Sequence, residues 1–436
     1  MFGIHAVNPD ESIIASIAWN LWAEGHMGTS LLEGVLPGIE HHVYWTMPLY
    51  YLLLAGWFGL WGFSLLAVRT LTTVLALGVI VILCCDSRWH QRRAVWMASA
   101  ILLCDLSFDY AATIGRMDML AILLTAAAII MIDVPRRSRW HTVGAGALAA
   151  GALLTHPLGA AAGFAVTLTV AMRDRRSLRL LLVGAAPPLL LWGLYISQDP
   201  GTFMAQMGLQ LARKAETPHS PLYNVGRCLG IYGAWWPAAV LLWMGGTVGL
   251  VLERRRHLPW LAAAASLWPV VLLLGEIAYP AYLAPVTAVG LAALLARIHW
   301  GPWLVAGALL ARLAPAAWDP PPPGGIDPAY EQYSAEIEQY LGRDQDVLIG
   351  LLPDPWFGLR HRQDLRIRLV PPVVVYEPLL HSYVFQSDVT IVGGYNPPGF
   401  VSVMDNWGLI ATRGQKLYVL ERDGMVDFDD VLSGLR

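Results

Sequence analysis

The sequence predicts an all-α, polytopic membrane domain followed by a small α/β or α+β domain. Composition supports the first part: the mean hydropathy is +0.50, and 56% of the 436 residues are hydrophobic while only 14% are charged. A soluble chain of this length does not need so much apolar surface. The second part rests on residues 324–436, where long apolar runs give way to short segments typical of strands.

The first predicted element is a helix that begins at Asn8-Pro9-Asp10-Glu11 and ends at Gly25. Asn is a favourable N-cap, Pro suits the first helical position, and acids complement the positive end of the helix dipole. Apolar residues then recur at helical spacing. The two acids either serve only the dipole or take part in chemistry, because acidic groups beside a membrane are costly unless they are used.

The membrane domain is expected between Leu65 and Leu313, with about ten spans. All the arginine clusters fall on one side of this arrangement, and the positive-inside rule makes that side cytoplasmic. Asp118, His156 and the tail after Pro320 are therefore predicted to lie outside. The clusters are at residues 88–93, 136–139, 173–179 and 254–256.

Two outer segments are expected to be loops, residues 108–118 and residues 197–227, the second with an amphipathic piece. Residues 143–172 are too long for one helix and are predicted to form a hairpin with His156 at its tip, because His-Pro interrupts them. The tail is predicted to contain one helix and five strands separated by Gly and Pro turns. These elements are residues 330–341, 346–352, 365–370, 373–376, 389–392 and 416–420.

The side on which Asp10 lies depends on Met47–Gly62. If this aromatic-rich segment spans the bilayer, Asp10 is cytoplasmic; if the segment lies in the interface, Asp10 is outside. Its short length favours the interface. The predicted division is a first outer loop with interfacial helices over 1–64, a transmembrane domain over 65–319 and an extracytoplasmic domain over 320–436.

Six segments carry a family resemblance by their order along the chain. They are NPDESIIASIAWNLWAEG at 8–25, YWTMPLYY at 44–51, a GFS…R pattern at 62–69, GRMDML at 115–120, LTHPLG at 154–159 and a Y-P…P pattern at 279–285. The set resembles the integral-membrane C-type glycosyltransferases, in particular the dolichyl-phosphate-mannose protein mannosyltransferases and the lipid A aminoarabinose transferases. Two features depart from that family: it carries a transmembrane helix before the acidic motif, which this sequence does not show, and His156 stands where Lys is common.

The resemblance implies the C-type glycosyltransferase superfold, an extracytoplasmic Asp10 and a sugar donor held on a polyprenyl phosphate. An acceptor hydroxyl would attack the anomeric carbon, which requires a carboxylate for the proton and cations for the leaving phosphate. Asp10 matches the general base, and Glu11 either orients it or caps the helix. Asp118 is a second acid that holds the acceptor or supports Asp10; alternatively, it is a solvated acid beside Arg116.

His156, Arg69 and Arg116 are the cations expected to bind the donor phosphate. For Arg69 the alternative is an interfacial anchor whose stem lies along apolar surface. Tyr279 and Tyr282 are candidates for packing on the lipid chain, with ordinary helix packing as the simpler interpretation.

Glu40, His41 and His42 are candidates for acceptor or metal contacts, although a His-His pair alone is weak evidence. No metal or other cofactor is expected. The expected partners are the lipid bilayer, the polyprenyl-phosphate sugar and an unidentified acceptor, but not nucleic acid. The expected location is the cytoplasmic membrane, with the site and the C-terminal domain on the outer side. A transporter or flippase is the competing class; it predicts acids within spans and inverted repeats, and the sequence shows neither.

Overall fold

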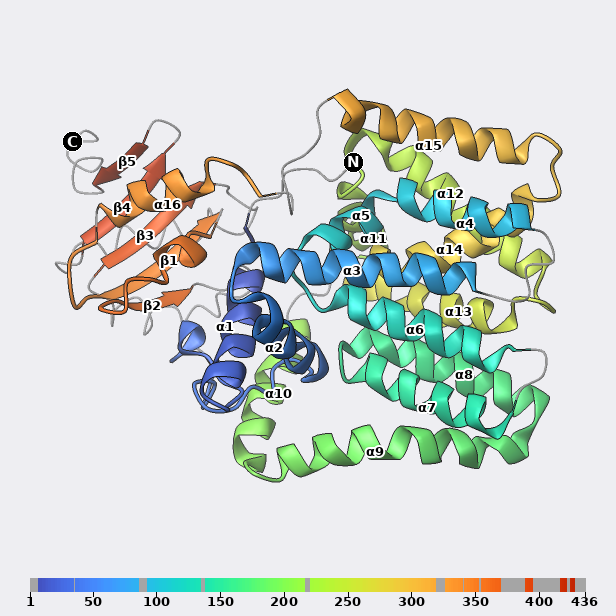
Figure 1. Ribbon diagram of the computed structural model, residues 1–436, viewed down its shortest axis with the longest axis horizontal. Coiled ribbons are helices and arrows are strands. Elements are labelled where there is room, and N and C mark those ends of the chain that lie inside the picture. Colours follow the sequence, from blue (N-terminus) through green and yellow to red (C-terminus); the bar gives the residue numbers. More distant parts are fainter. Residues whose placement is uncertain are drawn as a thin grey trace.

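The fold places a helical bundle at one end of the molecule and a small β-sheet at the other (Figure 1). Between them lies a short layer that contains α1 (Pro9–Ala23), α2 (Leu49–Trp61) and α10 (Pro200–Ala215). The computed structural model describes residues 7–34, 36–85, 92–134, 138–215, 220–318, 326–339, 341–352, 354–369, 389–394, 416–421 and 424–427.

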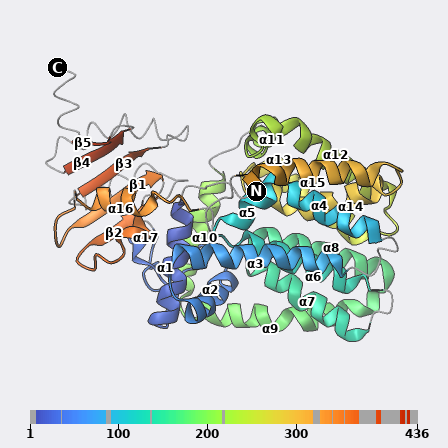
Figure 2. The same ribbon diagram turned by 45° about the horizontal axis from the view of Figure 1, so that its top comes forward.

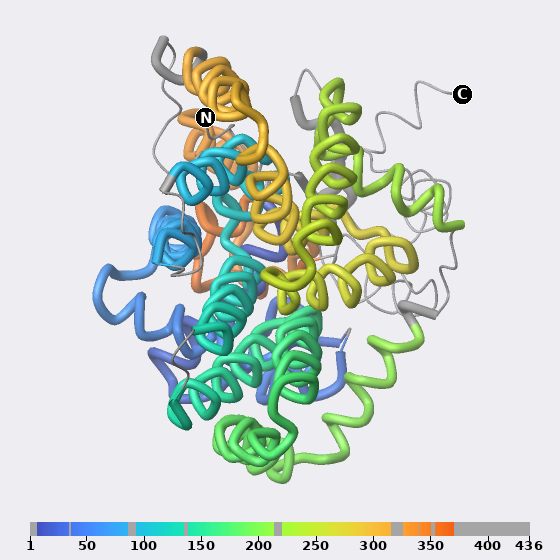
Figure 3. The backbone as a smooth tube through the Cα atoms, turned by 90° about the vertical axis from the view of Figure 1, so that its right-hand side faces the viewer, coloured from blue at the N-terminus to red at the C-terminus, as the bar shows by residue number. Residues whose placement is uncertain are grey.

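The bundle helices run side by side along the long axis of the molecule, and Figure 3 views them from the end opposite the sheet. They are α3 (Leu65–Cys84), α4 (Arg92–Cys104), α6 (Asp118–Ile132), α7 (Arg139–Leu153), α8 (Ala160–Arg173), α9 (Leu178–Ile196), α12 (Trp236–Leu252), α13 (Leu258–Leu274), α14 (Pro280–Leu295) and α15 (Gly301–Trp318).

Three helical stretches of the described chain are long and apolar enough to cross a membrane: Leu65–Cys84, Arg175–Ile196 and Gly233–Leu252. A fourth candidate is a pair of helices, Arg93–Cys104 and Leu106–Thr113, bent by 69° at a short break. Several other apolar helices of the bundle have 10–17 residues. The number of about ten spans therefore stays a prediction.

Small residues let the bundle helices approach closely. A Cβ on Gly249 of α12 would lie 1.9 Å from the backbone oxygen of Gly290 on α14, and a Cβ on Gly184 of α9 would lie 1.9 Å from that of Val143 on α7. Helices packed without a strong hydrophobic driving force depend on such close backbone contact. These two helix pairs therefore have glycines where no larger side chain fits.

Both segments predicted as loops in the bundle contain helices. Residues 108–113 belong to helix α5 (Leu106–Thr113). This helix begins where it does because Asp105 caps it by accepting hydrogen bonds from the backbone N–H groups of Ser107 and Phe108. Residues 197–227 contain α10 and most of α11 (Pro221–Gly230). The amphipathic pattern was visible in the sequence, but the polar residues masked the helix boundaries.

The C-terminal part contributes a five-stranded sheet in the order β2-β1-β3-β4-β5. The first three pairings in this order are parallel, and β4 and β5 pair antiparallel. The strands are β1 (Asp346–Leu352), β2 (Arg366–Leu369), β3 (Val389–Gly394), β4 (Lys416–Glu421) and β5 (Gly424–Asp427), accompanied by α16 (Tyr330–Glu338) and α17 (Trp356–Leu359). Figure 2 shows this sheet apart from the bundle. The strand expected at 373–376 lies outside the described residues, and the domain boundaries stay predictions.

The first loop packs against this C-terminal part. Leu31, in the 3-10 helix η1 (Ser30–Leu32), belongs to the same buried cluster as Val347 and Ile349 of β1. The backbone N–H of Asp354 donates to the carbonyl oxygen of Val7 at 2.8 Å. The segment before α1 and the C-terminal part therefore meet directly beside the acidic head of α1.

Candidate functional site

The head of α1 is held by a complete capping box. The side chain of Asn8 accepts a hydrogen bond from the backbone N–H of Asp10 at 2.9 Å, and the carboxylate of Glu11 accepts one from the backbone N–H of Asn8 at 3.0 Å. The helix begins at Pro9 as predicted. This geometry leaves Asp10 half-exposed while Glu11 turns inward and is fully buried.

Glu11 joins three separate segments through one buried carboxylate. It accepts two hydrogen bonds from Arg69 of α3, from Nε and from Nη2, both at 2.9 Å. It also accepts the backbone N–H of Gly115 at 2.8 Å. Gly115 is required there, because a Cβ would lie 2.1 Å from Cγ1 of Val68. Glu11 therefore fixes the loop that carries Arg116 relative to the first turn of α1, which carries Asp10.

Arg116 links the two acids that the sequence singled out. Its Nη1 donates to Oδ2 of Asp10 and its Nε donates to Oδ2 of Asp118 at 3.1 Å. The other oxygen of Asp118 accepts the hydroxyl of Tyr282 at 3.0 Å. Burial lowers the pKa of Arg116, but the charges of Asp10 and Asp118 outweigh it and raise that pKa, so the guanidinium stays charged.

Exposure differs along this row. The side chain of Asp118 is 1% exposed, that of Arg116 is 20% exposed and that of Asp10 is 34% exposed. Asp10 is therefore the carboxylate of the row that a substrate can reach, and Oδ1 of Asp10 has no hydrogen-bond donor within the described residues. Asp118 acts as a buried support for Arg116.

His156 lies at the same end of the bundle, between α7 and α8, as the hairpin prediction placed it. Its ring centroid is 5.4 Å from that of Tyr282 and 6.1 Å from that of Tyr279. Its Nδ1 accepts the backbone N–H of Leu158 at 3.2 Å, which caps a short 3-10 helix. Nδ1 is therefore the acceptor in this contact, and Nε2 is the ring nitrogen that carries a proton.

The structure brings some predicted site residues together and separates others. Asp10, Arg116, Asp118, His156 and Tyr282 form one contiguous group. Arg69 does not join it, since its side chain is fully buried and paired with Glu11. The geometry gives Arg69 a structural contact in place of the phosphate contact expected from the sequence.

Glu40, His41 and His42 lie elsewhere, in the first loop. His41 and His42 line a cavity of about 350 Å³ that is otherwise mostly apolar and includes Trp192 and Tyr195 of α9. The amide of Gln206 in α10 holds this loop by four hydrogen bonds, to the backbone groups of Pro37, His42, Tyr44 and Trp45. No group of three potential metal ligands occurs among the residues that were placed.

Tyr50 is a site residue that the sequence did not single out. Its hydroxyl is buried and has no hydrogen-bond partner in the described part of the chain. Burial raises its pKa, and the charges of Glu11 and Asp118 add to this rise. The available signal was its place in YWTMPLYY, which served only for the family resemblance.

Comparison with known proteins rests on structure, because no family model and no curated protein match this sequence. ArnT from Cupriavidus metallidurans, solved bound to undecaprenyl phosphate, matches with a TM-score of 0.61 and 16% identity over 95% of this chain and 88% of that chain. The chain has the ArnT fold. ArnT in the apo state matches with a TM-score of 0.58 and 16% identity, over 96% of this chain and 89% of ArnT.

A further match is the archaeal oligosaccharyltransferase AglB from Archaeoglobus fulgidus, in complex with an inhibitory peptide and a dolichol-phosphate. Its TM-score is 0.48 at 13% identity, over 84% of this chain and 61% of that chain. The likeness to ArnT agrees with the fold that the ordered motifs predicted. The bundle is thus that of a membrane protein.

Proposed function

We propose that this protein is a membrane glycosyltransferase that moves a sugar from a polyprenyl phosphate to an acceptor hydroxyl. The observation that carries the proposal is the row Asp10–Arg116–Asp118, which ends in an accessible carboxylate. The ArnT fold supports it, because ArnT was solved with undecaprenyl phosphate and that lipid phosphate belongs to the proposed donor class. The sugar and the acceptor are not assigned.

In the proposed reaction, the acceptor oxygen forms a bond to the anomeric carbon while the bond from that carbon to the phosphate oxygen breaks. Asp10 takes the acceptor proton, and the lipid phosphate leaves with the electron pair of the broken bond. Arg116 supplies positive charge beside the developing phosphate dianion. His156 donates its Nε2–H to that phosphate.

The chain's orientation is part of this proposal. Arginines that lie between α8 and α9 and after α12 are at the end of the bundle away from the sheet (Figure 1), and the positive-inside rule makes that end cytoplasmic. Asp10 and the sheet would then face outward. In a cysteine-free background, single cysteines at Glu24 and Gln332 should react with an impermeant reagent on intact cells, while one at Arg255 should react only after permeabilisation. Labelling of Arg255 before permeabilisation, or of only one outer position, contradicts the orientation.

Lipid analysis of cells tests the reaction without knowledge of the sugar. Cells that lack this protein should accumulate a polyprenyl-phosphate sugar, and the wild-type gene should clear it. Asp10→Asn should not clear it, because losing a general base slows transfer by about 10²–10⁴-fold. Glu24→Gln, an exposed acid just after the same helix, is the matched control and should behave as wild type. Clearance by Asp10→Asn, or no accumulation in the deletion, would reject the proposal.

A further inference from the structure

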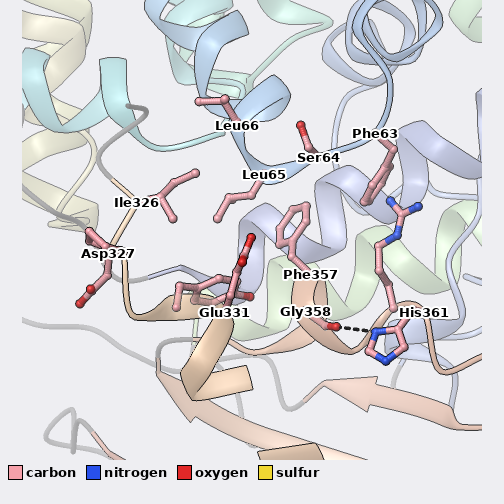
Figure 4. A pocket seen from close by; sticks show the side chains of 13 residues that line it. Phe63, Ser64, Leu65, Leu66, Ile326, Asp327, Glu331, Phe357, Gly358 and His361 are labelled. Atoms are coloured by element: carbon pink, nitrogen blue, oxygen red, sulfur yellow. Dashed lines mark hydrogen bonds between the residues drawn. The ribbon is translucent and has the colours of Figure 1, made fainter. Parts of the chain in front are cut away.

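A second cavity, of about 620 Å³, lies beside the acidic head of α1 but belongs to none of the groups described above. Its walls come from the turn between α2 and α3, from the segment that leads into α16 and from α17 (Figure 4). Leu65 lines it, and Arg69, one helical turn further along α3, binds Glu11. Leu65 and Arg69 are therefore about 6 Å apart along the axis of α3, so the cavity lies one helical turn from the residue that binds Glu11.

One wall of this cavity is aromatic. The ring centroids of Phe63 and Phe357 are 5.7 Å apart and their planes are inclined by only 33°. Both rings are partly exposed and face the same space in Figure 4. Tyr330 also lines the cavity, and its hydroxyl donates to the carbonyl oxygen of Asp354. The wall is thus a preformed apolar surface of fixed orientation.

A cation held by that wall keeps its hydrogen-bond donors available. The guanidinium carbon of Arg360 lies 4.0 Å from the ring centroid of Phe63 and 5.7 Å from that of Trp19. Within the described part of the chain Arg360 has neither an ion pair nor a hydrogen bond, and its side chain is exposed. Stacking fixes the plane of a guanidinium without using its N–H groups.

Two exposed carboxylates complete the lining. Glu331 and Asp327 lie on the far side of Phe357 from His361 (Figure 4). Asp327 accepts the backbone N–H of Ala329, and Glu331 has no partner among the described residues. The cavity therefore has acceptors on one side and a donor fork on the other.

We propose that this cavity binds a saccharide of the acceptor. A pyranose ring presents C–H groups that suit the negative face of an aromatic ring, and a rim of hydroxyls that suits carboxylates and a guanidinium. An anionic ligand would meet two carboxylates against one guanidinium, and an apolar ligand would strip water from all three charges. A volume of about 620 Å³ is in the range of small-ligand sites. The assignment to the acceptor, but not the binding itself, rests on the proposed function.

Saturation-transfer NMR on the full chain, in a detergent without a sugar headgroup, tests the binding. The probes are methyl glycosides of glucose, galactose, mannose and N-acetylglucosamine, together with maltose and chitobiose. At least one should receive saturation on its ring protons. Arg360→Ala and Glu331→Gln should each weaken its binding about tenfold, the loss expected for a hydrogen bond to a charged group.

Matched controls are Arg343→Ala and Glu336→Gln, exposed residues of the same region that do not line the cavity, and both should bind as wild type does. Saturation of no probe, or equal binding by the cavity variants and wild type, overturns the proposal. Asp10→Asn should keep saccharide binding while it loses clearance of the lipid-linked sugar. Binding without any effect of the deletion on lipid-linked sugars would reject the transferase and leave the saccharide site standing.

Discussion

The pairing of Glu11 with Arg69 predicts a strong energetic coupling between α1 and α3. Both side chains are fully buried, so removing one partner leaves an uncompensated charge. Glu11→Gln and Arg69→Met should each lower the free energy of unfolding by about 3–5 kcal/mol. The double variant buries neither charge. Its remaining cost is that the N–H groups of Asn8 and Gly115, which Glu11 accepts in the wild type, are imperfectly satisfied, which lowers the free energy of unfolding by about 1–3 kcal/mol.

A double-mutant cycle measures this difference, by SDS-induced unfolding of the purified protein followed by circular dichroism. The sum of the stability losses of the two single variants should exceed the loss of the double variant by about 3 kcal/mol or more. The phosphate role that the sequence suggested for Arg69, beside an interfacial anchor, makes the opposite prediction. If Arg69→Met unfolds like the wild type and weakens only the binding of polyprenyl phosphate, then Arg69 is a phosphate ligand and the structural reasoning is wrong.

Three other changes probe separate contacts. Burial raises the pKa of Asp354 to about 6 from 3.8, so the contribution of its carboxyl group to stability is present below about pH 4 and is lost as pH rises through 6. Asp354→Asn should therefore be more stable than wild type at pH 8, by up to about 3 kcal/mol. In thermal unfolding scans this difference in stability should close by pH 4. Gly115→Ala should cost about 1–3 kcal/mol and reduce transfer. Gly56→Ala, whose added Cβ meets nothing within 4 Å, should turn over as wild type does and gain up to about 1 kcal/mol of stability, because Ala favours a helix interior more than Gly. In titrations with polyprenyl phosphate, His156→Ala should weaken binding more than His156→Lys does. Equal affinity of both variants and wild type would show that His156 does not bind the phosphate.

The sequence was informative wherever a local rule applied. The capping box of α1 follows from four consecutive residues, and the hairpin around His156 follows from one His-Pro step. The strand expected at 346–352 is confirmed as β1. A short apolar run between polar turns is typical of a strand, so this element could be predicted locally. These predictions needed no knowledge of what lies across the fold.

Contacts between distant segments could not be predicted in the same way. Asp10 and Arg116 are separated by more than a hundred residues, and only the family resemblance placed them in one site. For Arg69, the sequence offered a phosphate contact or an interfacial anchor, and the structure provides a third outcome through Glu11. The residues around a charged side chain at the start of a helix do not indicate which distant residue it will pair with.

The contact between Leu31 and the strand β1 also has a consequence for biosynthesis. Apart from Ile13, the side chains of the cluster that buries Leu31 are made by the ribosome roughly 300 residues later, which takes about 15–60 s at ordinary elongation rates. The loop with the acidic head is therefore among the first segments translated and among the last to reach its final packing. Until then most of the cluster that buries Leu31 is missing, so a nascent chain stalled before β1 should be open to proteases at this loop.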